Sequence, residues 1–188
     1  YKEWGDVEEG NGYAIDTEKL YENVMNRYKY GGLDTPGLYL DETTMRICYS
    51  HRRLFAQLAK ELVKQGDNAR AQKVLAYAEQ AIPAYNVPQV YESGSYDIAT
   101  AYASIGETGK AITLLNDLIS ESRDYIDWAF SLGDSRIAMV QRDCLYKFWQ
   151  WNQCNGLLKD MDKERYKQSN QQFEEKYMRL AQLMNYQN

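Results

Sequence analysis

The sequence predicts an all-α fold built from antiparallel helix pairs, on three observations. The 188 residues contain only 3 prolines, and their long stretches of Ala, Leu, Gln, Glu, Lys and Arg favour helix. Strand-type alternation is scarce, and Gly37-Leu38-Tyr39-Leu40 is its one weak candidate. Two segments with the same spacing of apolar and small residues surround Gly66 and Gly106, which lie 40 residues apart.

The first half of the chain shows three helices. The first covers residues 16–30, because Asp16 or Thr17 can cap its start and Gly31-Gly32 can end it. A long helix follows from Asp41 to Gln65, with apolar residues at helical spacing. These apolar residues are Ile47, Leu54, Phe55, Leu58, Ala59 and Leu62. The third helix spans Asn68 to Ala81 and closes at Pro83.

The second half continues the helical pattern without a linker long enough to separate domains. Its predicted helices run from Gln89 to Ile105, from Gly109 to Ser122, over a short stretch from Tyr125 to Leu132, from Asp134 or Ser135 to Asn155-Gly156, and from Asp160 or Asp162 to Met184. Four clustered aromatic residues, Tyr146, Phe148, Trp149 and Trp151, span more than one helical face, so we expect some in the core and others exposed.

The two similar segments resemble tetratricopeptide repeats, whose period is 34 residues, and the loop 84–89 accounts for the longer spacing here. We place repeat one at about 52–83 and repeat two at about 92–123. Small residues let each helix pair approach closely, Ala59 with Ala71 and Ala99 with Ala111. Two repeats are fewer than a stable stack needs, so helices at about 16–30 and 134–186 would cap it. The prediction is one helical-repeat domain over residues 1–188.

A wider resemblance rests on the stretch from Tyr28 through Gly31-Gly32 and Tyr39-Leu-Asp-Glu-Thr43 into Arg46 and Arg53. Further matching positions are Phe55, Leu58, Ala59, Leu62, Gly66 and Ala71, and Trp4-Gly5 also fits. The stretch resembles the C-terminal soluble region of a large bacterial family of uncharacterised multi-spanning membrane proteins. In that family, an N-terminal membrane domain similar to protein O-mannosyltransferases precedes a tetratricopeptide-like tail.

The resemblance implies a soluble tail that binds a partner or positions the membrane domain. It covers about the first two-thirds of the chain and carries over no catalytic residue. It implies tethering to a bacterial membrane and favours the extracytoplasmic side. Because the chain starts at Tyr1 and not at Met, we expect a piece of a longer protein.

Composition limits the other function classes. A formal net charge of −5 argues against nucleic-acid binding, and no run approaches the ~18 apolar residues of a membrane span. Cys48 and His51 share a helical face, but His51 is the only histidine, so we expect packing or surface placement there and neither a catalytic dyad nor a metal site. The acidic run Asp160 to Glu164 lacks the glycine and final glutamate of a calcium loop. We therefore predict no enzyme, no cofactor and no metal.

The candidate site is the face that the first helix of each repeat would turn toward a groove. Its peptide-groove candidates are Arg53, Gln57, Lys60, Lys64, Tyr96, Asp97 and Thr100. The same mapping also places Ala56, Ser93 and Ser104 on this face. The first repeat's set is cationic, so an acidic or C-terminal peptide could dock there. A merely solvated charged face is the competing interpretation.

The functional hypothesis is a non-enzymatic protein-interaction or positioning module. Its partner would be a protein or peptide, with the parent's own membrane domain as one candidate. The alternative is a carbohydrate- or small-ligand-binding module that uses the Tyr-rich surface, since 17 tyrosines suit sugar stacking and polar contact. Binding lost on Tyr96→Ala would favour this alternative.

Overall fold

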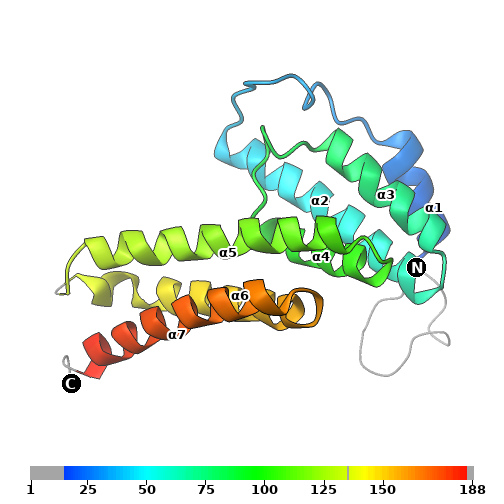
Figure 1. The fold of residues 1–188 in the computed structure, drawn as a ribbon. Coiled ribbons are helices and arrows are strands. Elements are labelled where there is room, and N and C mark those ends of the chain that lie inside the picture. Colours follow the sequence, from blue (N-terminus) through cyan, green and yellow to red (C-terminus); the bar gives the residue numbers. More distant parts are fainter. Residues whose placement is uncertain (1–14, 135, 186–188) are drawn as a thin grey trace. The chain divides into compact units, whose positions relative to one another are not determined.

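A computed structural model describes residues 15–134 and 136–185, and over these residues the chain is helical, with loops and no strand (Figure 1). The elements are α1 (Thr17–Glu22), the π-helix η2 (Asn23–Arg27), α2 (Glu42–Lys64), α3 (Asn68–Ala81), the 3-10 helix η3 (Tyr91–Ser93), α4 (Ser95–Ser104), α5 (Thr108–Ser131), α6 (Ile137–Met161) and α7 (Lys163–Asn185). The all-α prediction is confirmed. The weak strand candidate at 37–40 is loop, and Trp4-Gly5 lies outside the described residues.

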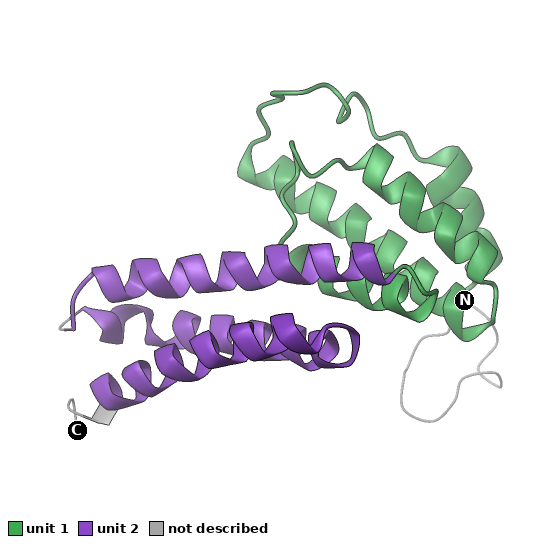
Figure 2. Ribbon diagram, in the orientation of Figure 1, with its two compact units in different colours: residues 1–107 green, residues 108–188 purple. Residues whose placement is uncertain are grey.

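The chain separates into two compact units, residues 1–107 and 108–188 (Figure 2). This boundary lies between α4 and α5, the two helices that cover the predicted second repeat. The single repeat domain therefore stays a prediction, as does the capping role of residues 134–186. Each unit is described by itself below.

In unit 1, the turn that ends α2 and the turn that ends α4 have the same geometry. Gly66 has φ +77°, its N–H bonds the Val63 carbonyl at 2.9 Å, and the Asp67 N–H bonds the Leu62 carbonyl at 2.9 Å. This is the Schellman pattern, in which a left-handed glycine satisfies the last helical carbonyls. The turn after α4 repeats it 40 residues later, with bonds from Gly106 to Ala103 and from Glu107 to Tyr102. The two glycine turns therefore share backbone geometry as well as residue pattern.

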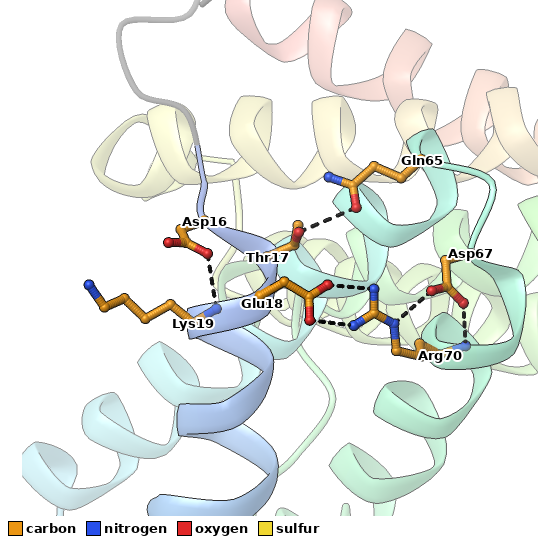
Figure 3. A network of polar contacts seen from close by, with 7 residues as sticks. All are labelled: Asp16, Thr17, Glu18, Lys19, Gln65, Asp67 and Arg70. Atoms are coloured by element: carbon orange, nitrogen blue, oxygen red, sulfur yellow. Dashed lines mark hydrogen bonds and ion pairs between the residues drawn. The ribbon is translucent and has the colours of Figure 1, made fainter. Parts of the chain in front are cut away.

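The segment α1 is fixed to the turn between α2 and α3 through Arg70 (Figure 3). The Arg70 guanidinium donates to Glu18 on α1 at 2.9 Å and to Asp67 at 2.6 Å. The Asp67 carboxylate also accepts the Arg70 backbone N–H and so caps α3. The buried Thr17 donates its hydroxyl to Gln65 at 3.3 Å. The arginine thus joins α1 to the start of α3, two elements that are far apart in sequence.

Two loops of unit 1 are held together by Asn86. Its amide nitrogen donates to the carbonyls of Leu33 and Thr35, both at 2.7 Å, and its Oδ1 accepts the Leu38 N–H at 3.3 Å. The neighbouring Tyr85 hydroxyl donates to the Asp34 carbonyl at 2.7 Å. The long loop that precedes α2 therefore has a fixed conformation without regular secondary structure.

Two predicted boundaries in unit 1 are wrong. The first helix leaves helical geometry at Tyr28, before Gly31-Gly32, because Tyr28 is extended at φ −69° and ψ 145°. The fourth helix begins at Ser95 and not at Gln89, because Gly94 takes φ +83° between η3 and α4. A residue in the left-handed region interrupts a helix, so the chain forms only the short η3 before it.

In unit 2, the predicted helices at 109–122 and 125–132 are one continuous helix, α5. Its buried residues Ile119, Ile126 and Phe130 keep one face inside without a break. The helix α6 likewise passes through Gly156, which was predicted to end it, and continues to Met161.

The prediction that the aromatic cluster of α6 has both core and exposed members is confirmed. Phe148 and Trp151 are buried, and Tyr146 and Trp149 are exposed.

The helices α5 and α7 are parallel. In each of three side-chain contacts between them, the α7 residue follows the α5 residue by 49 positions in the sequence. Arg123 donates to Gln172 at 3.3 Å, Lys176 pairs with Asp127, and Arg179 lies 4.4 Å from the Phe130 ring centroid. Between the middle of α5 and the start of α7 a hollow of about 770 Å³ opens. Its lining is polar apart from Ile119, and the ion pair Arg165–Asp162 lies within it.

Candidate functional site

All seven predicted groove residues lie on α2 and α4, which pack against each other in unit 1. The α2 residues Arg53, Gln57, Lys60 and Lys64 are spaced by four, three and four positions, which places them on one helical stripe. Tyr96, Asp97 and Thr100 occupy the first two turns of α4. We call these seven residues the α2/α4 face.

One ion pair joins the two helices across this face. The Lys60 Nζ lies 2.8 Å from the Asp97 Oδ1, and each side chain is about two-fifths exposed, 41% and 43%. At this exposure solvent screens the charges, so the pair contributes little stability. Its importance is positional, because it places one cation and one anion at the same point, where a partner's charged group can compete for either.

The other two cations are also engaged. Arg53 donates to the Glu92 carbonyl at 2.6 Å, and Lys64 donates to Glu61 at 2.6 Å. The predicted cationic row is therefore a row of cations that already bond internal acceptors, with ion pairs at Lys60 and Lys64 and a backbone carbonyl at Arg53. An acidic peptide that binds any of these cations would compete with an internal acceptor.

The uncharged part of the face offers aromatic and polar groups. The rings of Tyr91 and Tyr96 are stacked, with centroids 5.3 Å apart. Thr100 donates its hydroxyl to the Tyr96 carbonyl at 3.0 Å. Gln57 is exposed and makes no side-chain hydrogen bond to another described residue. The face therefore combines a flat aromatic surface with an amide that can both donate and accept.

Two further residues that the sequence mapped to the groove are buried. Ala56 is 1% exposed and packs inside unit 1. Ser93 is fully buried, and its hydroxyl accepts from Arg52 at 3.1 Å. The 3-10 geometry of η3 turns Ser93 inward, so the helical periodicity assumed for it does not apply.

Sequence reasoning missed Arg52, which is 1% exposed. Its guanidinium donates to the carbonyls of Pro88 at 2.7 Å, Val87 at 2.6 Å and Ile82 at 3.1 Å. Burial lowers the pKa of Arg52 to about 10, so it stays charged at neutral pH. It thereby fixes the connection between α3 and α4, and so the start of the α2/α4 face. Its spacing from Cys48 and Phe55 was the available signal, because all three lie on the buried side of α2.

Cys48 lies on the buried side of α2, three residues before His51. Cys48 is buried, and that burial raises the pKa of its thiol, which disfavours the thiolate that nucleophilic chemistry needs. In unit 2, Asp162 accepts the Arg165 backbone N–H at 3.0 Å and caps α7. Over residues 15–134 and 136–185, no group of three or more His, Cys, Asp or Glu side chains could hold a metal ion.

Comparison with protein-family models, curated proteins and solved structures finds no match for this chain. None of the helices in the described residues is both long enough and apolar enough to cross a bilayer.

Proposed function

We propose that this chain is a non-enzymatic, tetratricopeptide-like module that binds an extended peptide segment of a protein partner on the α2/α4 face. The single observation that carries the proposal is the Lys60–Asp97 ion pair between neighbouring helices. The repeated Schellman turns at Gly66 and Gly106 support the repeat interpretation. The resemblance to membrane-protein tails makes a parent membrane domain one candidate source of the peptide.

The ion pair makes the binding charge-selective in a way that substitutions can reverse. Asp97→Asn releases Lys60, so peptides with a carboxylate should bind more tightly. Lys60→Met releases Asp97, so peptides with a basic side chain should gain instead. Charge pairs at partly exposed positions are worth about 0.2–1 kcal/mol, which is a change of roughly 1.4- to 5-fold in Kd.

The experiment selects peptides from a displayed random library on the full 188-residue chain and measures their Kd by fluorescence anisotropy. Opposite shifts in the two variants support the proposal. The control is Glu22→Gln, which breaks the exposed Glu22–Arg27 pair outside the α2/α4 face and should leave Kd unchanged. If no peptide is enriched, or if both variants bind every selected peptide as the wild type does, this proposal is wrong.

The stacked Tyr91–Tyr96 pair favours a second candidate, a carbohydrate-binding face. Sugar rings pack on flat aromatic surfaces, and Thr100 and Asp97 lie beside Tyr96 to hydrogen-bond hydroxyl groups. A glycan array separates the two candidates. Glycan binding that Tyr96→Ala removes and Lys60→Met leaves intact would favour the carbohydrate function over the peptide function.

A further inference from the structure

A small apolar hollow lies in unit 1 between the start of α2 and the loop that precedes it. Its volume is about 270 Å³. Its walls include loop residues and the side of α2 that carries the Cys48 and His51 pair. Its lining includes Tyr30, Leu38, Leu40, Ile47, Cys48 and His51.

The rim of this hollow exposes large apolar side chains. Leu38 is 39% exposed, and Ile47 is 54% exposed. Burying a side chain of this kind gains about 1.5–3 kcal/mol, so exposed neighbours around a hollow mark a surface that a ligand can cover. The loop bearing Leu38 is fixed by Asn86, so the hollow is preformed.

The wall of the hollow contains an unsatisfied polar group. His51 lies between two tyrosine rings in edge-to-face geometry, with centroids 5.7 Å from Tyr28 and 5.6 Å from Tyr30. Its Nδ1 is buried and has no hydrogen-bond partner among the described residues. With the imidazole proton on Nε2, the Nδ1 is an acceptor, and leaving it buried without a donor is unfavourable. Because the imidazole lines the hollow, rotation about Cβ–Cγ can turn this nitrogen toward a bound donor.

Size and chemistry then define the class of ligand. Pockets for drug-sized molecules measure about 300–1,000 Å³, so this hollow suits a single aromatic ring system. The Tyr30 ring and the Cys48 sulfur favour aromatic contact. Lys29 is its only charged lining residue, so no carboxylate selects a cation.

We propose that this hollow binds one aromatic group that carries an N–H or O–H donor, such as an indole or a phenol, with His51 as the acceptor. The site is independent of the α2/α4 face. Nine residues separate His51 from Lys60, which at 100° per residue places them on opposite sides of α2.

The sole histidine of the chain makes the test direct, because the imidazole ¹⁵N resonances can belong only to His51. The full chain is titrated with indole and with 1-methylindole, which lacks the donor. We expect saturable binding of indole with a Kd of about 0.1–1 mM, a change in the Nδ1 resonance, and about 2- to 10-fold weaker binding of 1-methylindole. A short glycine-flanked tryptophan peptide tests the second source of the same group. Tighter binding of the peptide assigns the site to a protein partner, and tighter binding of free indole assigns it to a small molecule.

Two test variants and one control variant keep the proposal falsifiable. Ile47→Lys places a charge at the exposed rim without disturbing the core and should abolish binding, whereas Thr43→Lys on the same helix should not. His51→Phe should bind both probes equally, because the acceptor is gone and the ring remains. Absence of a saturable shift, or equal binding by wild type and Ile47→Lys, would overturn the proposal.

Discussion

Gly94 passes so close to α2 that a Cβ added to it would lie 3.0 Å from the Arg53 Cγ and 3.2 Å from the Arg53 Cα. It also has φ +83°, a left-handed conformation that favours glycine. This close approach lets the start of α4 pack against α2. The α2/α4 face therefore depends on a residue without a side chain.

We expect Gly94→Ala to destabilise the chain by about 2–4 kcal/mol, because backbone strain and steric overlap add. Gly66→Ala is the matched control. It has a similar φ of +77° but open space around the added Cβ, so it should cost only about 1 kcal/mol. Urea unfolding followed by circular dichroism measures both. Equal losses in the two variants would mean that the Arg53 contact has no steric consequence.

A third glycine gives the opposite prediction. Gly156 lies inside α6 without a positive φ, and a Cβ there would meet nothing within 4 Å. Gly156→Ala should therefore stabilise unit 2 by about 0.5–1 kcal/mol, since alanine has the higher helix propensity. The measurement is again the urea midpoint. A decrease in stability would show that the helix does not continue through Gly156.

Removing the buried guanidinium of Arg52 should reduce the stability of the fold strongly. Arg52→Met leaves the carbonyls of Val87, Ile82 and Pro88 without this donor, and we expect a loss of about 2–4 kcal/mol. Arg46→Met is the matched control on the same helix, because Arg46 is exposed and pairs only with Glu42. It should change stability by less than about 0.5 kcal/mol. Similar unfolding midpoints for the two variants would contradict the role assigned to Arg52.

The helices that sequence could predict are those whose caps and apolar spacing agree. Asp41 accepts the Thr44 N–H at the start of α2, and Asp67 caps α3 as its position before the apolar run indicates. The end of α6, predicted at Gly156, and the start of α4 were both predicted wrongly, for opposite reasons. A glycine inside a helix costs only about 1 kcal/mol, which packing overrides, whereas Gly94 is constrained by a contact with α2 that no local pattern contains.

In the candidate site, too, the sequence pattern contains some of the features and lacks others. Helical spacing assigned Lys60 and Asp97 to two different helices, and in the structure these helices, α2 and α4, contact each other and the two side chains form an ion pair. It did not reveal that Arg53 binds the Glu92 carbonyl, because that acceptor lies in η3, outside the repeat pattern. Arg52 was missed because a charged residue is ordinarily predicted to be exposed. The carbonyls that surround it in the core are known only from the structure.

Acid should weaken the attachment of α1. Hydrogen bonds from Arg70 hold the pKa values of Glu18 and Asp67 below their ordinary values of 4.5 and 3.8. A carboxylate whose pKa is lower in the folded state stabilises the fold above its unfolded pKa, and that contribution disappears as pH falls through the folded value. Arg70→Met should therefore be less stable than wild type at pH 7, and the two urea midpoints should converge toward pH 2. A difference that persists at that pH would show that Arg70 acts through packing and not through charge.

The last prediction concerns the loop before α2, which Asn86 fixes. Asn86→Asp keeps the size of the side chain but removes both donors to Leu33 and Thr35 and places a carboxylate against their carbonyls. We expect a loss of about 1–3 kcal/mol. Faster hydrogen exchange should appear at the Leu38 amide, whose acceptor is Asn86 Oδ1.

Asn26→Asp serves as the control, because Asn26 is exposed and bonds only the Glu22 side chain. It should leave Leu38 exchange unchanged. If the hollow is preformed by this loop, Asn86→Asp should also weaken indole binding although Asn86 is not among its lining residues. Unchanged exchange at Leu38 would show that the loop is held by contacts other than Asn86. Unchanged indole binding with accelerated exchange would show that the hollow forms without a rigid loop.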